Sequence, residues 1–388
     1  MYQFYLPTRV IFGRNAINTL AKNVKHLGKT SLIVCGKQSI KESGLLKRVV
    51  EMLNSENIKT TVFDRVFSEP DTKIVEEGIS VARENDCNLI IGIGGGSVLD
   101  TAKAISGLTK IKNISSVSDY LEIDGTKNLS EEISAVGTAC FVAVPTISGS
   151  GAEVTMNAVL INSKTGKKRS LRNPCLFAGL ALVDPELTLT LPADITAIAG
   201  IDALCHLIEG YISKESNIVC DALSIRGMEL VLNSLPELIK DRNNISARTD
   251  IALASLYGGI MIANSGLTLA HGLGSVIGPK FSIPHGLACG IVLPGVLEYN
   301  LSHSKGNIPE DKIAILKELF GKNPATKIQQ FMSGVNLPTR LTGLENFHHL
   351  TGNDLKEIAE ESLNTGSAKK NPVQVNPETV IEIIKTYI

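Results

Sequence analysis

Short apolar runs alternate with amphipathic stretches through the first half of the chain. The apolar runs predict strands at 31–35, 60–63, 88–93, 140–144 and 180–183. Several of these runs are apolar at every position, which is typical of strands covered by helices on both faces. Amphipathic patterns between them predict helices at 42–54, 72–85 and 97–107. This β-α-β order favours a parallel, doubly wound sheet.

The pattern changes in the middle of the chain. Segment 157–172 predicts a β-hairpin, because residues 162–166 carry turn-forming side chains between two short apolar runs. After Asp184-Pro185, long helical patterns follow and few strands are expected. A length of 388 residues also suits two domains. We therefore expect an α/β domain over residues 1–185 and an all-helical domain over residues 186–388.

Composition narrows the choice of partners. The chain has 38 basic and 39 acidic residues, so it lacks the basic surface that nucleic acid or an anionic membrane selects. Its seven cysteines are scattered without a C-x-x-C pair, which fits a reducing compartment, and the N-terminus has no secretory pattern. We expect a cytoplasmic protein. Segment 251–279 is uncharged and long enough to span a membrane, but its polar residues favour buried helices instead.

A glycine-rich turn is the first candidate for chemistry. The buried run at 88–93 leads into Gly94, Gly95 and Gly96, and a helix with Ser97 at its cap follows. Backbone N–H groups at such a helix start favour phosphate or pyrophosphate. The turn lacks both the G-x-G-x-x-G fingerprint and the lysine of a P-loop. A tight turn required by packing alone is the alternative interpretation.

Four residues of the second half form a candidate metal site. Asp202 and His206 are four residues apart, so a helix places a carboxylate and an imidazole on one face. This pair by itself also fits a structural hydrogen bond. His271 and His285 lie in uncharged sequence, where buried imidazoles need specific partners. One carboxylate with three imidazoles suits Fe(II) or Zn(II) better than Ca(II) or Cu(I).

These motifs, together with Pro145–Thr155 and Asp184-Pro185, resemble the iron-containing (group III) alcohol dehydrogenase family. The resemblance implies a Rossmann-like domain followed by a helical domain, the architecture shared with dehydroquinate synthases, and an active site in the cleft between them. It also implies NAD(P)-dependent oxidation of a small alcohol or reduction of an aldehyde, without a protein nucleophile. We expect a homodimer.

The resemblance assigns residues to the metal and to the cofactor. Asp202, His206, His271 and His285 would bind the metal, Fe(II) by resemblance, although Zn(II) also suits the set. Gly95, Gly96, Ser97 and Asp100 would touch the cofactor pyrophosphate, with Gly94 in the same turn. The rest of the dinucleotide site would include Thr146, Ser150, Thr155 and Lys168.

Two departures from the family concern the cofactor and the proton path. Many members that prefer NAD have an Asp after the strand ending at Cys35, whereas this chain has Gly36-Lys37-Gln38-Ser39. We assign Gly36 and Ser39 to the cofactor site and expect NADP(H) to be used at least as well as NAD(H), because Lys37 and Ser39 suit a 2′-phosphate. The second departure is Ser275, where the family often has a histidine. It either passes a proton along a chain or packs on the cofactor.

Other functions fit parts of the same pattern. A metal-dependent hydrolase or lyase acting on a phosphorylated small molecule would use the glycine turn and the metal site without a dinucleotide. Glycerol dehydrogenases and dehydroquinate synthases join the same fold to a metal and a nicotinamide cofactor. A metal-binding scaffold without activity is the third alternative. Cofactor binding separates the hydrolase from the dehydrogenase.

Overall fold

The computed structural model describes residues 1–67, 69–348 and 350–388. Its chain divides into two compact units. The α/β unit contains Leu6–Ile147 and Gly151–Thr190. The helical unit contains Leu191–Ile388 together with two short pieces, Met1–Tyr5 and Ser148–Ser150. The fold class expected from the sequence is confirmed: a parallel α/β sheet domain precedes an all-helical one.

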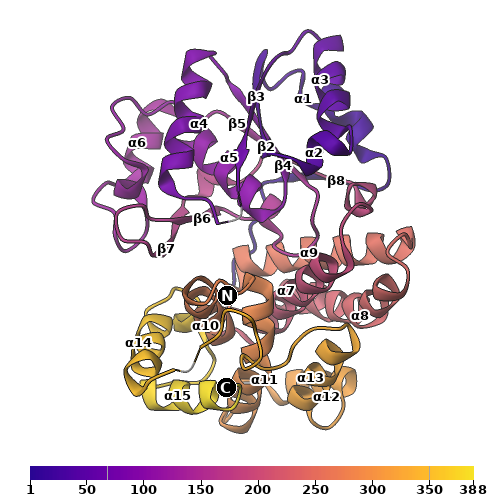
Figure 1. Ribbon diagram of the computed structural model, residues 1–388, viewed down its shortest axis with the longest axis vertical. Helices are drawn as coiled ribbons and strands as arrows, with labels where there is room; N and C mark the ends of the chain where they lie inside the picture. Colours follow the sequence, from indigo (N-terminus) through magenta and orange to yellow (C-terminus); the bar gives the residue numbers. More distant parts are fainter. Residues whose placement is uncertain (68, 349) are drawn as a thin grey trace. The chain divides into compact units, whose positions relative to one another are not determined.

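A six-stranded sheet forms the centre of the α/β unit, with strand order β1-β8-β5-β4-β2-β3 (Figure 1). Every neighbouring pair is parallel. The strands are β1 (Arg9–Phe12), β2 (Thr30–Gly36), β3 (Lys59–Val66), β4 (Leu89–Gly94), β5 (Cys140–Pro145) and β8 (Leu180–Val183). Five of them are the strands that the apolar runs predict. The sequence pattern missed β1, a four-residue strand at the sheet edge that pairs with β8.

Helices cover both faces of this sheet, as the continuously apolar strands predict. On one face, Ile33, Ile91 and Val142 pack with α1 (Leu20–Val24) and α3 (Leu45–Ser55). On the other face, the alternate strand residues, among them Leu32, Ile90 and Ala143, pack against two long helices. These are α4 (Thr72–Glu84) and α5 (Gly96–Leu108), and the short helices α2 (Ser39–Glu42) and α6 (Leu129–Val136) complete the unit. The predicted helices thus correspond to α3, α4 and α5.

Strand order reverses between β2 and β4. The chain runs outward from β2 to β3, and then returns to place β4 and β5 on the opposite side of β2. In open α/β sheets, ligands bind at the carboxyl ends of the strands beside such a reversal. Gly36, Gly94 and Thr146 follow one another along this edge, because Cys35 pairs with Ile93 and the Thr146 N–H donates to Gly94 O at 3.0 Å.

The predicted hairpin is present beside this sheet. Strands β6 (Asn157–Ile161) and β7 (Lys168–Arg172) pair antiparallel and form a sheet of their own. The Gly166 N–H donates to Asn162 O at 2.8 Å, so the turn closes at the residues whose composition predicted it.

The helical unit is built around α7 (Ala193–Ile212), which packs against α8, α9 and α11. A side chain at Gly200 would lie 2.6 Å from Leu235, and one at Gly210 would lie 2.6 Å from Met261, so these glycines allow close helix packing. The other helices are α8 (Ile218–Lys240), α9 (Ile245–Asn264), α10 (Leu269–Lys280), α11 (His285–Ser302), α12 (Glu310–Phe320), α13 (Pro324–Gly334), α14 (Gly352–Leu363) and α15 (Pro377–Lys385).

Apolar helices of this unit have the length of membrane spans. Among the described residues, α7 is long and apolar enough to cross a membrane. Helices α9 and α10 meet the same criteria only when taken together, as a pair bent by 105°. The apolar window of α7 is 89% buried inside the structure, as in the core helix of a helical domain. The uncharged segment 251–279 forms most of α9 and α10, and its helical residues are largely buried, as expected.

Candidate metal centre and cofactor site

One face of α7 carries three buried polar residues. Asp202, His206 and Glu209 are separated by four and three residues, so they lie in one row along the helix. Their exposed fractions are 7%, 3% and 0%. The His206 Nε2 atom lies 3.8 Å from Asp202 Oδ1. Gly286 of α11 packs directly on Asp202, because a side chain there would lie 2.7 Å from the Asp202 Cβ.

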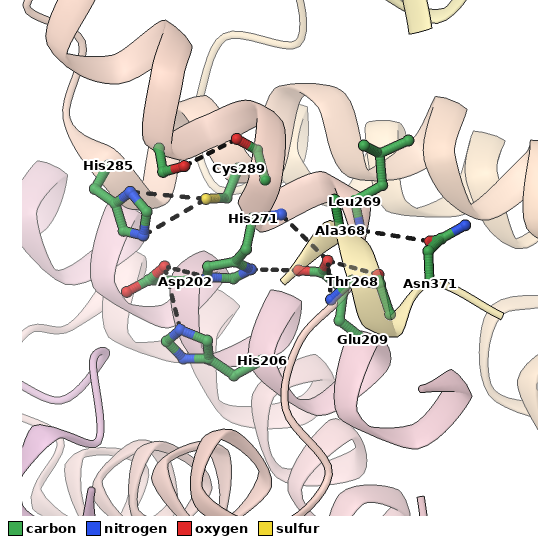
Figure 2. A network of polar contacts seen from close by, with 12 residues as sticks. Asp202, His206, Glu209, Thr268, Leu269, His271, His285, Cys289, Ala368 and Asn371 are labelled. Atoms are coloured by element: carbon green, nitrogen blue, oxygen red, sulfur yellow. Dashed lines mark hydrogen bonds and ion pairs between the residues drawn. The ribbon is translucent and has the colours of Figure 1, made fainter. Parts of the chain in front are cut away.

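Two further histidines reach this face from α10 and α11. His271 is the third residue of α10, and its Nε2 lies 3.6 Å from Asp202 Oδ1 (Figure 2). The His206 and His271 rings stack with centroids 4.5 Å apart, and the His285 ring lies 5.3 Å from that of His271. The structure therefore brings Asp202, His271 and His285 into one group of candidate donor atoms. It places His206, the fourth residue that the sequence assigned to a metal, beside Asp202 but outside that group.

Two buried polar atoms of this cluster lack hydrogen-bond partners among the described residues, as expected of a site that binds an ion. Asp202 Oδ1 and His271 Nε2 are buried and have no hydrogen-bond partner among the described residues. Leaving such atoms unpaired is costly, and a divalent cation bound between them satisfies both. The candidate donor atoms of Asp202, His271, His285 and Cys289 all lie within 4.8 Å of one another. The residues present thus fit a resident Fe(II) or a similar ion.

The charge states of Asp202 and His206 agree with metal binding, whereas His271 would have to lose a proton. Burial would lower the pKa of His271, but Cys289 and Glu209 outweigh it and raise this pKa well above its usual value. Burial alone would raise the pKa of Asp202, but the surrounding histidines outweigh it and hold the pKa well below its usual range. Burial lowers the pKa of His206 to about 4, although Asp202 opposes this shift. Near neutral pH the cluster therefore contains an anionic carboxylate and a neutral imidazole, the forms in which both side chains bind metals.

Glu209 is a site residue that our sequence analysis did not single out. Its Oε1 accepts hydrogen bonds from the Thr268 hydroxyl at 2.7 Å and from the His271 N–H at 3.2 Å, while its Oε2 contacts the His271 Nδ1. This contact fixes the ring so that Nε2 faces Asp202. Burial would raise the pKa of Glu209, but His271 and Thr268 lower it, so the carboxylate stays ionised.

The ring of His206 is also oriented from behind. Its Nδ1 lies 3.2 Å from the Gly149 carbonyl oxygen, which accepts the ring N–H. The Nε2 lone pair is thereby directed at Asp202. Ser275 is half-buried and donates its hydroxyl hydrogen to the Gly272 carbonyl at 2.9 Å.

The glycine turn leads directly from β4 into α5. The helix begins at Gly96 with Gly95 as its N-cap, so the expectation that Ser97 caps it is wrong. The turn residues pack closely, because a side chain at Gly94 would lie 2.6 Å from Val98 and one at Gly95 would lie 2.8 Å from Ile147. Among the described residues no side chain caps α5, and uncapped N–H groups at a helix start are able to bind an anion. Close packing therefore explains these glycines, and phosphate binding at the turn stays a prediction.

A fully buried lysine organises the residues next to this turn. Lys103 donates to Thr155 Oγ1 at 2.9 Å and to the carbonyl oxygens of Ala152 and Asn157. It also lies 3.4 Å from Asp100 Oδ1, and Asp100 Oδ2 accepts the Val159 N–H at 2.9 Å. Asp100 thus connects α5 to β6 through Val159, and Lys103 connects α5 to β6 through Asn157 and to Thr155 just before it. The expected contacts of Asp100 and Thr155 with the cofactor stay predictions.

The remaining assigned cofactor residues occupy several places. Gly36 ends β2, and Ser39 is exposed at the start of α2. Thr146 and Ser150 are half-buried after β5, and Ser150 belongs to the helical unit. Lys168 forms an ion pair with Glu69 at 2.9 Å. The predicted roles of these residues in cofactor binding also stay predictions.

Comparison with known proteins gives the same class for both units. Residues 7–185 match "Iron-containing alcohol dehydrogenase" and residues 196–388 match "Fe-containing alcohol dehydrogenase family, C-terminal". The 1,3-propanediol dehydrogenase of Citrobacter freundii is 31% identical over 400 residues, covering 99% of this chain and 98% of the relative. The NAD-dependent methanol dehydrogenase of Bacillus methanolicus is 27% identical over 400 residues, covering both chains completely. A solved iron-containing alcohol dehydrogenase of Thermotoga maritima superposes with a TM-score of 0.86 at 30% identity, covering 100% of this chain and 99% of that one.

The fold, the buried carboxylate–histidine cluster and these matches define an NAD(P)-dependent oxidoreductase of the alcohol dehydrogenase type. More specifically, the chain belongs to the iron-containing alcohol dehydrogenase family. It is a metal-dependent alcohol dehydrogenase or aldehyde reductase. This decides against the alternative of a hydrolase or lyase acting on a phosphorylated small molecule.

Proposed function

We propose that the chain interconverts a small alcohol and its aldehyde with Fe(II) held by Asp202, His206, His271 and His285. The observation that carries this proposal is the pair of buried, unpartnered atoms, Asp202 Oδ1 and His271 Nε2, which face each other at 3.6 Å. When bound, the metal supplies a Lewis acid that polarises the substrate oxygen, and the nicotinamide carries the hydride.

The chain's own residues do the positioning. Glu209 holds His271, and the Gly149 carbonyl holds His206, so both imidazoles present Nε2 to Asp202. Burial keeps water away from the cluster. The Ser275 hydroxyl cannot serve as a base near neutral pH, but it can pass a proton onward.

A metal-reconstitution assay tests the proposal. Chelated protein is loaded anaerobically with Fe(II) or Zn(II), and oxidation of NADH and NADPH is followed with a panel of small aldehydes. We expect metal-dependent oxidation that is strongest with Fe(II). Equal turnover in the chelated and the reconstituted protein would contradict the proposed centre, and the aldehyde that gives the highest kcat/KM would define the substrate class.

We also propose that NADP(H) is used at least as well as NAD(H). Gly36 and Ser39 lie at the β2 end beside the strand reversal, and the exposed Lys37 between them suits a 2′-phosphate. Asp64 at the end of the neighbouring strand β3 is ion-paired with Lys41. This pairing offsets the charge by which Asp64 would repel a phosphate.

The cofactor proposal is tested by comparing kcat/KM for NADPH and NADH. A value for NADPH more than about tenfold lower, roughly 1.4 kcal/mol in the transition state, would refute it. Lys37→Glu is expected to lower the ratio of kcat/KM for NADPH to kcat/KM for NADH. Lys47→Glu, at an exposed position of α3, serves as the charge-matched control.

Two further proposals complete the assignment. We propose that the protein works as a homodimer, which analytical ultracentrifugation tests. We also propose a cytoplasmic location, supported by the seven cysteines, all of which are free. Fluorescent tagging and cell fractionation test that location.

A further inference from the structure

A sulfur atom lies inside the carboxylate–histidine cluster. Cys289 follows His285 by one turn of α11, and it is fully buried. Its Sγ lies 3.7 Å from the His285 Nε2 and 3.9 Å from the Nδ1 (Figure 2). With Asp202 and His271, these two residues form a group of four whose donor atoms lie within 4.8 Å of one another.

Helix packing holds the sulfur at this place. Gly274 of α10 lies against Cys289, since a side chain at that glycine would come 2.3 Å from Sγ. The missing side chain allows α10, which carries His271, to pass close to the turn of α11 that carries Cys289. The thiol is therefore packed beside two proposed ligands and not exposed to solvent.

Two distances within the cluster match those between neighbouring ligands of one ion. In tetrahedral Zn(II) sites, with bonds of about 2.0 Å to nitrogen or oxygen and about 2.3 Å to sulfur, neighbouring ligand atoms are about 3.4 to 3.6 Å apart. Asp202 Oδ1 and His271 Nε2 are 3.6 Å apart, and Cys289 Sγ and His285 Nε2 are 3.7 Å apart. Two pairs of donor atoms are thus already spaced as neighbouring ligands of one ion.

A simple thiol–imidazole hydrogen bond explains less of the geometry. Such a bond would give Cys289 and His285 partners, but it would leave Asp202 Oδ1 and His271 Nε2 buried without any among the described residues. One ion placed among the four donor atoms gives partners to all of them.

We propose that Cys289 is an additional protein ligand, which makes the centre a mixed oxygen, nitrogen and sulfur site that favours Zn(II) over harder ions. The inference rests on the metal centre under the proposed function. On binding, the Cys289 S–H bond breaks, its proton goes to solvent, and a sulfur electron pair forms the bond to the ion. Thiolate ligands select Zn(II), whereas Mn(II) prefers oxygen donors.

X-ray absorption of the unmodified protein provides the direct test. The chelated full-length chain is loaded with one equivalent of Zn(II), and the extended fine structure is fitted for scatterers around the ion. We expect one sulfur at about 2.3 Å in addition to nitrogen and oxygen. A Co(II)-loaded sample should also show a sulfur-to-metal charge-transfer band in the near ultraviolet.

A pair of variants tests selectivity. Cys289→Ser is expected to weaken Zn(II) binding at least tenfold in a chelator competition, and to change Mn(II) binding less than threefold. Cys220→Ser is the matched control, because Cys220 is an equally buried thiol that lies in α8, outside the group of four. We expect the control to bind both ions as the unmodified protein does.

The outcomes separate this inference from the proposed function. A bound ion with sulfur in its shell supports the inference. A bound ion surrounded by nitrogen and oxygen alone overturns the role of Cys289 and leaves the metal centre standing. A chain that binds no ion overturns both.

Discussion

The Glu209 carboxylate holds His271 at two points, through the backbone N–H at 3.2 Å and through the ring Nδ1. The contact joins α7 to the first turn of α10, where a carboxylate is also favoured by the helix dipole. One buried acid thus sets both the position of a helix and the direction of its metal-facing nitrogen.

Replacing Glu209 should therefore weaken metal binding without removing a ligand. We expect Glu209→Gln to lower Fe(II) and Zn(II) affinity by about 10- to 100-fold, the usual effect of losing such a partner. Competition with a chelator measures the affinity. Glu237→Gln on the exposed surface of α8 is the control, and unchanged affinity in Glu209→Gln would show that His271 needs no orientation.

Gly149 should affect the metal site through its carbonyl. A Cβ at this position would lie 2.8 Å from Ala199 O, so the backbone must move and the hydrogen bond to His206 weakens. We expect Gly149→Ala to cost about 1–3 kcal/mol of unfolding free energy and to lower metal affinity. Urea denaturation and chelator competition check both effects. Gly334→Ala, where nothing lies within 4 Å, should leave metal affinity unchanged.

Lys103 should be among the most sensitive positions of the α/β unit. Lys103→Met leaves Asp100 mostly buried without its cationic partner, which should cost roughly 3–5 kcal/mol. The double variant Asp100→Asn with Lys103→Met should recover part of that loss, because the unpaired charge is gone. Urea denaturation of both variants and of the exposed control Lys110→Met measures these differences. A loss below about 1 kcal/mol in Lys103→Met would contradict the buried role.

Glu153 should make stability depend on pH. Burial raises its pKa to about 7, above the usual value of 4.5 for a glutamate. Between these values the folded state binds more protons than the unfolded state, so stability falls as pH rises. From pH 5 to pH 8 the loss should be about 2.5 kcal/mol. Glu153→Gln should remove this dependence on pH, whereas Glu378→Gln at an exposed position should retain it. Thermal unfolding at pH 5 and at pH 8 measures the difference.

Much of the α/β unit was predictable because its signals are local. The strands β2, β4 and β5 are continuous apolar runs, and the helices between them have one apolar face. Strand β1 escaped prediction because its four residues become a strand by pairing with β8, some 170 positions later. The N-cap of α5 was misplaced because Gly95, which has no side-chain signal, takes the extended backbone that begins the helix.

The metal residues were predictable for a different reason. Asp202, His206, His271 and His285 stand out as polar groups in apolar sequence, and the family resemblance joined them. Glu209 belongs to the same row on α7, and the spacing of Asp202, His206 and Glu209 was a usable signal. Cys289 gives a weaker signal, because a cysteine in an apolar helix is ordinarily a small core residue.

The proposed ligands come from three helices, and this has a consequence for how the protein resists unfolding. Asp202 and His271 are 69 positions apart (271 − 202), so an ion that joins α7 to α10 closes a long loop. Such a closure acts as a reversible cross-link that restricts the unfolded chain. The melting temperature should therefore rise with the free metal concentration, and a cell starved of metal would hold a population more open to proteases.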